Sequence, residues 1–312
     1  MTVTVATVEP PQRTGQMVLL RPTVLSMFSL SPKAFRAVCG VALGSLCVIV
    51  FTGALVRLTG SGLGCADWPR CSSEKFIDVS AGHTLIEQAN RLFTGVVSAS
   101  VIAAVLFAYR RKNRQTKIIV YAWGLVVGVL AQVVVGGIVV LTGLNPFANM
   151  AHFLISMVLI ANAFVLYRSS ADETMSNVFR KSPSIDHRLF PLLGVLSIGA
   201  LVTGTVVTAT GPHAGDENAV RFGFALESVA RIHSVSIICT ITLICFIAFK
   251  LKNSHDENSK DAMLALLVVS LMQGAIGYTQ YFTGVPVILV SAHIIGAIAF
   301  WLSVCNVMLA PR

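Results

Sequence analysis

Three of the seven histidines, His152, His233 and His293, lie within long apolar stretches of the sequence. An imidazole in such a place either makes a hydrogen bond between helices or binds a metal ion. His152 and His293 each end the same Gln-x9-Thr-Gly-x8-His pattern, which a helix–helix hydrogen bond explains poorly. Helical bundles hold haem iron between two axial imidazoles on facing helices. We therefore interpret His233 and His293 as an axial pair for a haem.

Zinc is the competing metal. A structural zinc ion takes four close ligands, commonly cysteine and histidine. The cysteines within the apolar stretches show no metal-ligand spacing, and we expect them to be small buried apolar side chains; they are Cys39, Cys47, Cys239, Cys245 and Cys305.

Glu87 is one of the few acids outside clearly aqueous segments. A carboxyl group at membrane depth is functional by default. On a helix, Glu87 shares a face with Asn90 and with His83, although His83 can also precede the helix. Two interpretations of Glu87 stay open, a proton acceptor in catalysis and an ion pair with Arg91. Arg91 itself either extends to the membrane interface or contacts haem propionates.

Cys65 and Cys71 form a Cys-x5-Cys pair in a polar segment. An oxidising compartment permits a disulfide there, and two free thiols are the alternative. The disulfide would be a structural link or a redox-active pair, and an exposed bond in so short a loop would be reducible.

The elements that must position these residues are membrane helices. Only 12% of the 312 residues are charged and 55% are hydrophobic, whereas soluble domains carry roughly 25% charged residues. This excludes a cytosolic enzyme and a disordered chain, and no basic helix supports nucleic-acid binding despite a net charge of +9. A spanning helix needs about 20 apolar residues, and eight stretches qualify: 35–57, 85–109, 118–141, 150–168, 189–209, 224–249, 262–283 and 286–309. We predict an all-α integral membrane protein with eight transmembrane helices.

Positive charge orients the chain. Most of the 23 lysines and arginines fall in segments that share one side with residues 1–34, which places both termini in the cytoplasm. Residues 1–34 lack the pattern of a signal peptide and form a cytoplasmic tail, with a transit peptide as the weaker alternative. Residues 169–188 form a cytoplasmic linker that carries His187, and His255 lies in another cytoplasmic loop.

The two halves of the chain repeat each other. Thr52-Gly53 recurs as Thr203-Gly204, and the pattern Gln132, Thr142-Gly143, His152 recurs as Gln273, Thr283-Gly284, His293. Residues 35–168 and 189–309 are thus predicted to be two pseudo-symmetric four-helix bundles, related by an axis along the membrane normal. The register of the second and sixth spans is ambiguous. One register pairs Glu87 and Arg91 with Glu227 and Arg231, and an ion pair between Glu227 and Arg231 is favoured. A second register, shifted by three residues, pairs Asn90 with His233.

Residues 53–71, Gly-Ala-Leu-Val-Arg-Leu-Thr-Gly-Ser-Gly-Leu-Gly-Cys-Ala-Asp-Trp-Pro-Arg-Cys, closely resemble the first outer loop of haem A synthases. Further likenesses are Ile86-Glu87-x2-Asn90-Arg91, Met150-Ala151-His152, Arg231-Ile232-His233 and Ser291-Ala292-His293. The resemblance covers residues 35–309 and fits the bacterial form, since the longer extensions of mitochondrial relatives are absent.

The resemblance implies an oxidoreductase of a bacterial plasma membrane. Haem A synthases oxidise the C8 methyl group of haem O to a formyl group by successive hydroxylations. The product serves cytochrome oxidase assembly, and haem O synthase supplies the substrate. In the family, the C-terminal half holds haem b, which matches His233 and His293. The N-terminal half takes haem O, which matches His152, Asn90 and Arg91 with Glu87 as the catalytic residue, and the cysteine pair matches Cys65 and Cys71.

This chain departs from the family at one position. Many members have histidine where this chain has Asn90, and an amide is a poor iron ligand. We therefore expect His152 to be the sole histidine ligand of the haem in the N-terminal half, with the opposite face open or held by water. His83 is a weaker candidate for a substitute ligand.

Two other functions fit the histidines alone. One is an electron-carrying dihaem membrane cytochrome, and the other is a haem transporter or chaperone. The loop motif and Glu87 favour the enzyme, since a plain electron carrier needs neither.

Overall fold

The computed structural model describes residues 31–80, 82–111, 114–171, 188–253 and 256–309. Within these ranges the secondary structure consists of eight helices and contains no strand, so the predicted all-α class is confirmed. All eight are long and apolar enough to cross a membrane. They are α1 (Pro32–Leu58), α2 (Gly82–Tyr109), α3 (Thr116–Leu141), α4 (Pro146–Ser169), α5 (Leu189–Thr210), α6 (Leu226–Leu251), α7 (Glu257–Phe282) and α8 (Val287–Leu309).

Several helices begin earlier than their hydropathy predicts, because polar caps start them. Ser31 Oγ accepts a hydrogen bond from the backbone N–H of Ala34 at the start of α1. Asn145 caps α4 in the same way, and Asp256 caps α7 by accepting from the N–H of Ser259. These side chains satisfy N–H groups that have no partner within the helix. Hydropathy therefore locates the apolar part of each helix and misses its first polar turn.

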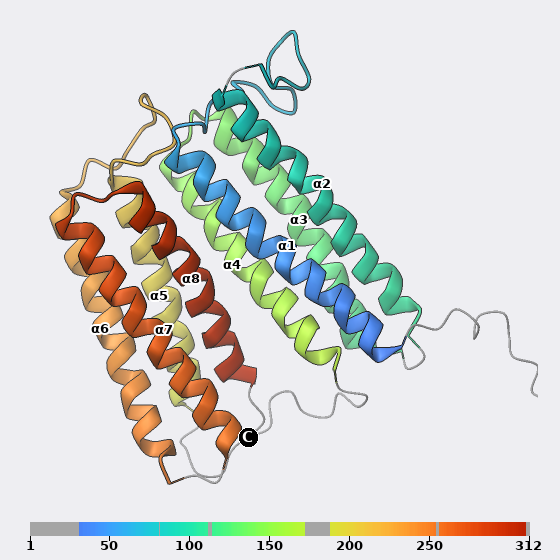
Figure 1. Cartoon of the computed structure of the whole chain (residues 1–312), viewed down its shortest axis with the longest axis vertical. Coiled ribbons are helices and arrows are strands. Elements are labelled where there is room, and N and C mark those ends of the chain that lie inside the picture. The colour runs from blue at the N-terminus through green and yellow to red at the C-terminus, as the bar shows by residue number, and fades with distance from the viewer. Residues whose placement is uncertain (1–30, 81, 112–113, 172–187, 254–255, 310–312) are drawn as a thin grey trace, which may run out of the picture.

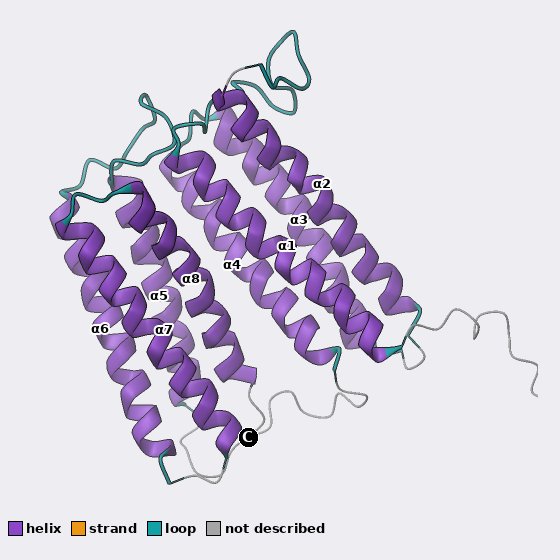
Figure 2. Ribbon diagram, in the orientation of Figure 1, coloured by secondary structure: helices purple, strands orange, loops and turns teal. Residues whose placement is uncertain are grey.

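The helices form two bundles that lie side by side (Figures 1 and 2). In the first bundle α1 packs on α2, α2 on α3, α3 on α4 and α4 on α1. In the second bundle α5, α6, α7 and α8 close a ring in the same order. The two pseudo-symmetric four-helix bundles predicted from the internal repeat are therefore confirmed.

The bundles meet through α1, α4, α5 and α8. The indole N–H of Trp301 in α8 donates to the carbonyl of Met157 in α4 at 2.7 Å. Near the end of α1, Arg57 donates from Nε to the carbonyl of His213 at 2.7 Å and from Nη2 to that of Thr208 at 2.9 Å. Both interactions join the first bundle to the second and fix the relative position of the two candidate sites.

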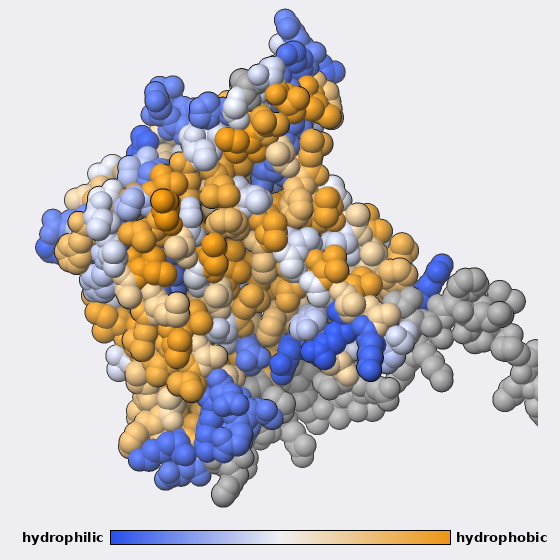
Figure 3. Space-filling model, in the orientation of Figure 1, coloured by the Kyte–Doolittle hydropathy of each residue, from blue (hydrophilic) through white to orange (hydrophobic). Residues whose placement is uncertain are grey.

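The outer surface of the bundles is apolar. Figure 3 shows a hydrophobic band across the helices, with hydrophilic residues gathered toward both ends. Val127 and Ile288 are 62% and 81% exposed, respectively. Such exposure on long helices is typical of contact with lipid, and the chain is a multi-pass membrane protein.

Four connections, 59–80, 142–145, 211–225 and 283–286, lie at one end of the molecule, together with Cys65 and Cys71 (Figure 1). We call this end the disulfide end. Helices α1 and α8 begin and finish, respectively, at the opposite end. Most of the predicted tail 1–34, most of the predicted linker 169–188, and the loop histidines His187 and His255 lie outside the described residues.

Candidate functional site

The candidate ligands occupy four equivalent places in the structure. In each helix hairpin, one polar side chain from the second helix lies against a glycine of the first, about two turns from the disulfide end. A Cβ atom added to Gly204 or Gly277 would come within 3.1 Å or 3.2 Å of an imidazole Cε1. The four pairs are Gly53 with Asn90, Gly136 with His152, Gly204 with His233 and Gly277 with His293.

The hydrogen bonds at two of these places settle the register of the repeat. The hydroxyl of Thr52 donates to Oδ1 of Asn90 at 2.8 Å. The hydroxyl of Thr203 lies 3.0 Å from Nδ1 of His233. Since Thr52-Gly53 is the repeat of Thr203-Gly204, Asn90 is the structural counterpart of His233. The register that pairs Glu87 with Glu227 is therefore not the one that the folded helices follow.

In the second bundle, His233 and His293 form a pair suited to one iron. Each ring lies against a glycine of the preceding helix, His233 against Gly204 and His293 against Gly277. Thr203 Oγ1 lies 2.9 Å from the carbonyl of Gly199, to which it donates, so its lone pair can accept from Nδ1–H of His233. That arrangement leaves Nε2 of His233 with a free lone pair. Within the described residues neither Nε2 has a hydrogen-bond partner, and these nitrogens fit axial ligation of haem.

The first bundle holds only one of these imidazoles. His152 faces Gly136 in the way that His293 faces Gly277. The position opposite is Asn90, whose Oδ1 is already bonded to Thr52, so its amide presents N–H donors to its surroundings. The two bundles share a framework, but only the second has two imidazoles at the equivalent positions.

Cys65 and Cys71 form a disulfide, as predicted. The two residues are 0% and 3% exposed, so the expectation of an exposed bond is wrong. The loop folds back on itself, with the N–H of Cys71 donating to the carbonyl of Lys75 at 3.1 Å. The buried position favours a structural link.

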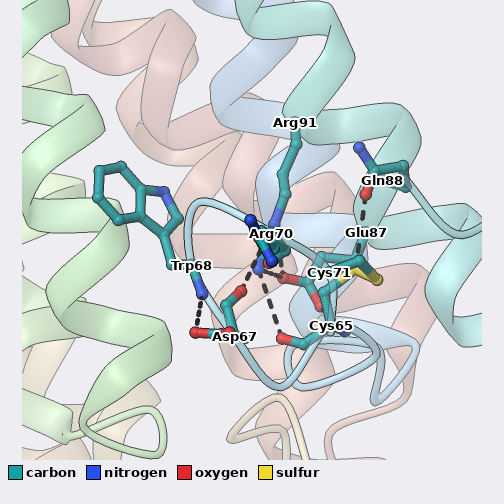
Figure 4. Close-up of polar contacts among 8 residues, drawn as sticks. All are labelled: Cys65, Asp67, Trp68, Arg70, Cys71, Glu87, Gln88 and Arg91. Carbon is teal, nitrogen blue, oxygen red and sulfur yellow. Dashed lines mark hydrogen bonds and ion pairs between the residues drawn. A yellow bond between two sulfur atoms is a disulfide. The ribbon is translucent and has the colours of Figure 1, made fainter. Parts of the chain in front are cut away.

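Glu87 and Arg91 hold the disulfide loop on the end of α2 (Figure 4). Glu87 is 5% exposed, and its Oε2 accepts from the backbone N–H of Cys65 at 2.7 Å. Its Oε1 accepts from Nε and Nη2 of Arg91, at 3.0 Å and 2.6 Å. Arg91 Nη1 donates further to the carbonyls of Asp67 and Arg70. The Glu87–Arg91 ion pair, one of the two interpretations that the sequence left open, is present. It is largely buried and anchors the disulfide loop.

Trp68 carries the loop onto the first bundle, a contact that sequence reasoning missed. Figure 4 shows its indole directed away from Arg91, toward the neighbouring helices. A Cβ on Gly137 of α3 would lie 2.8 Å from the indole ring, so only glycine allows this approach. Gly136, the preceding residue, faces His152. Trp68 of the loop motif and His152 therefore contact consecutive glycines of α3. The Trp-Pro of that motif was the signal available in the sequence.

Three other residues that the sequence singled out lie away from these four positions. Glu227 and Arg231 pair with each other, but their side chains are 61% and 77% exposed, as expected for a surface ion pair. His83 lies in the first turn of α2, and its Nδ1 is 2.9 Å from Oγ of Ser61. Seven residues separate His83 from Asn90, which is about 10 Å along a helix, so His83 does not share the Asn90 position.

Within the described residues, no three histidines, cysteines or acids gather into a group able to hold a metal ion. A haem iron needs at most two protein ligands, because the porphyrin supplies four. The five cysteines outside the disulfide are free thiols dispersed along the helices. Cys39 and Cys305 are buried as expected, but Cys239 and Cys245 are exposed on α6, so the expectation of burial is wrong for these two.

The sequence matches the family described as cytochrome oxidase assembly protein, COX15-CtaA, over residues 36–305. The chain belongs to this family. The match spans all eight helices, so both bundles and the disulfide loop are part of the COX15-CtaA fold.

Curated relatives of this family member are named Heme A synthase. The protein of Geobacillus kaustophilus is 35% identical over 125 residues, which cover 40% of this chain and 38% of the relative. That of Geobacillus thermodenitrificans is 36% identical over 106 residues, 34% and 33% of the two chains. That of Listeria welshimeri is 36% identical over 124 residues, 38% and 40% of the two chains. The chain thus aligns with less than half the length of each of these relatives.

Proposed function

We propose that this protein is a haem A synthase, which oxidises the C8 methyl group of haem O to a formyl group. Each of two hydroxylations removes two electrons from the methyl carbon, and the resulting gem-diol loses water. The observation that carries the proposal is the difference between equivalent places, Asn90 with His152 in one bundle and His233 with His293 in the other. Family membership and the relatives named Heme A synthase support the same activity.

The second bundle is proposed to hold haem b as the resident cofactor, with His233 and His293 as iron ligands. The free Nε2 of His233 and the glycine contacts of both rings support this assignment. A b-type haem supplies one-electron transfer when bound. The protein contributes two fixed neutral imidazoles and a surrounding that excludes water.

The first bundle is proposed to bind the substrate haem O through His152 alone. Asn90 lies at the opposite position but cannot replace an imidazole, because its amide oxygen is engaged by Thr52 and amide nitrogen has no free lone pair. The face toward Asn90 therefore stays open for chemistry. Arg91 and Trp68 at the disulfide end contribute a cation and an aromatic wall beside the bound substrate.

Glu87 is proposed as the proton acceptor when the methyl group is oxidised. Its carboxylate has about four lone-pair positions, and three donors from Cys65 and Arg91 take part of this capacity. Burial next to Arg91 keeps the carboxylate in place, about one helical turn from Asn90 on the same face of α2. General-base catalysis of this kind contributes about 10²–10⁴-fold to a rate.

The proposed location is a bacterial plasma membrane with both termini in the cytoplasm. The distribution of lysine and arginine along the sequence supports this orientation, and it puts the disulfide end in the oxidising compartment. Haem O synthase is the proposed source of the substrate, and cytochrome oxidase assembly is the proposed destination of the product.

The test is pigment analysis after co-expression with a haem O synthase. We expect haem A, with a hydroxylated intermediate, in extracts from cells that carry the intact chain. If only unmodified haem accumulates while the purified protein is folded and loaded, the enzyme assignment is wrong and a dihaem carrier or haem transporter replaces it. The matched control is a His152→Ala chain, which should keep the low-spin haem b and lose the conversion.

A further inference from the structure

Gln132 and Gln273 lie beside the candidate ligands at equivalent places of the repeat. Nε2 of Gln132 donates to the backbone carbonyl of His152 at 3.0 Å, and Nε2 of Gln273 donates to that of His293, also at 3.0 Å. Each glutamine is one helical turn from the glycine that touches the same imidazole, since residues four apart share a helix face. Each amide is therefore bonded to the backbone of its histidine, one helical turn from the glycine that faces the ring.

Both pairs leave the same two atoms without partners. Oε1 of each glutamine and Nδ1 of each neighbouring histidine are buried and make no hydrogen bond to the described residues. An unpaired donor or acceptor buried away from water is destabilising, and each half of the protein leaves one acceptor and one potential donor in this state. The orientation of the amide is set, because only its nitrogen can donate to the histidine carbonyl.

The surroundings of each glutamine are built to hold its amide. At Gly296, three residues after His293, any side chain would collide with the amide of Gln273. In the first bundle Oγ of Ser156 lies 2.6 Å from Nε2 of Gln132 and accepts from it, while donating to the carbonyl of His152 at 2.9 Å. The fold makes room for these amides and anchors them by different means in the two halves.

We propose that Gln132 and Gln273 are positioning residues that accept a hydrogen bond from Nδ1–H of His152 and His293 when haem is bound. A ring nitrogen that donates to an acceptor fixes the tautomer, so that Nε2 carries the lone pair for iron. Thr203 serves His233 in the same way, which completes one partner for each ligand. This inference rests on the proposed haem sites.

The acceptor has a measurable electronic effect. A hydrogen bond from Nδ1–H makes the imidazole more basic, which favours ferric iron and lowers the reduction potential. Gln273→Leu removes the acceptor, and Gln273→Glu keeps one. We expect the midpoint potential of the low-spin haem b to rise in Gln273→Leu and to stay at or below the parent value in Gln273→Glu.

The experiment is a redox titration of the purified full-length protein, with electron paramagnetic resonance of the ferric haem. Gln132→Leu is the matched control from the other bundle and should leave the haem b potential unchanged, while weakening haem O binding by about 10–100-fold. An unchanged potential in Gln273→Leu, or an equal rise in Gln273→Glu, overturns the inference and leaves the haem sites standing. Absence of low-spin haem from the parent protein overturns the proposed function together with it.

Discussion

Asn90 of α2 and His233 of α6 occupy equivalent positions in the two bundles. Each accompanies a threonine-glycine pair of the preceding helix, and each is hydrogen-bonded to that threonine, Thr52 or Thr203. The duplication has therefore kept the framework and exchanged the side chain that faces the haem position. A histidine in one half is matched by an amide in the other. Under the proposed function, this difference separates the site of the resident cofactor from the site of the substrate.

Asn90→His should convert the substrate site into a two-histidine site. Thr52 would bond the new imidazole as Thr203 bonds His233, so its Nε2 would face the iron. We expect the haem bound in the first bundle to become low-spin and the rate of methyl oxidation to fall by at least about tenfold, since the open face is lost. Optical and paramagnetic resonance spectra of protein loaded with haem O measure the first effect. A high-spin haem in this variant would show that Asn90 does not face the iron.

Gly277→Ala should weaken haem b binding by displacing its ligand. The new methyl group would lie 3.2 Å from Cε1 of His293, which is tighter than ordinary contact. Overpacking of this kind costs about 1–3 kcal/mol, and we expect a lower haem b content and a shifted spectrum. Gly274→Ala is the control, because nothing lies within 4 Å of its added carbon on the same helix. Equal haem contents in the two variants would contradict the placement of His293.

The sequence predicted the fold well because its signals are local. Long apolar stretches, turn residues and a repeated Gln-x9-Thr-Gly-x8-His pattern each lie within one hairpin, and the same pattern identified His152 and His293. The ambiguous register of the repeat needed the structure, because the spacing of Glu87 and Glu227 matches as well as that of Asn90 and His233. Contacts across helices, here Thr52 with Asn90, decide between the two.

Features that depend on the path of a loop could not be predicted. The cysteine pair was visible, but its burial results from the fold of residues 65–76 and from Arg91. The approach of Trp68 to Gly137 joins a loop to a helix far along the chain, and no spacing encodes it. The spacing of Glu87 and Arg91 allows an ion pair, and such a pair is compatible both with a catalytic role of Glu87 and with a structural one. The sequence alone therefore could not choose between the two interpretations of Glu87.

Replacing Cys65 and Cys71 by serine tests whether the disulfide is structural. A link of this length contributes about 2–4 kcal/mol to stability in a chain-entropy estimate. Because both residues are buried, we expect a lower melting temperature with activity retained below it. Thermal unfolding followed by fluorescence, with haem O conversion at a low temperature, provides both measurements. Lost activity with unchanged melting would instead indicate redox chemistry at the pair.

Glu87→Gln and Arg91→Lys together separate catalysis from loop anchoring. The Glu87→Gln variant keeps the size of the side chain and one acceptor oxygen but loses the basicity, so we expect haem O oxidation to fall by about 10²–10⁴-fold. The Arg91→Lys variant keeps a positive charge but lacks the planar fork that reaches both Glu87 and the carbonyl of Asp67. It should loosen the loop and expose the disulfide to a water-soluble phosphine, with a smaller loss of activity. The readouts are the turnover of haem O and the rate of disulfide reduction. If both variants lose equal activity and both expose the disulfide, Glu87 acts only by holding the loop.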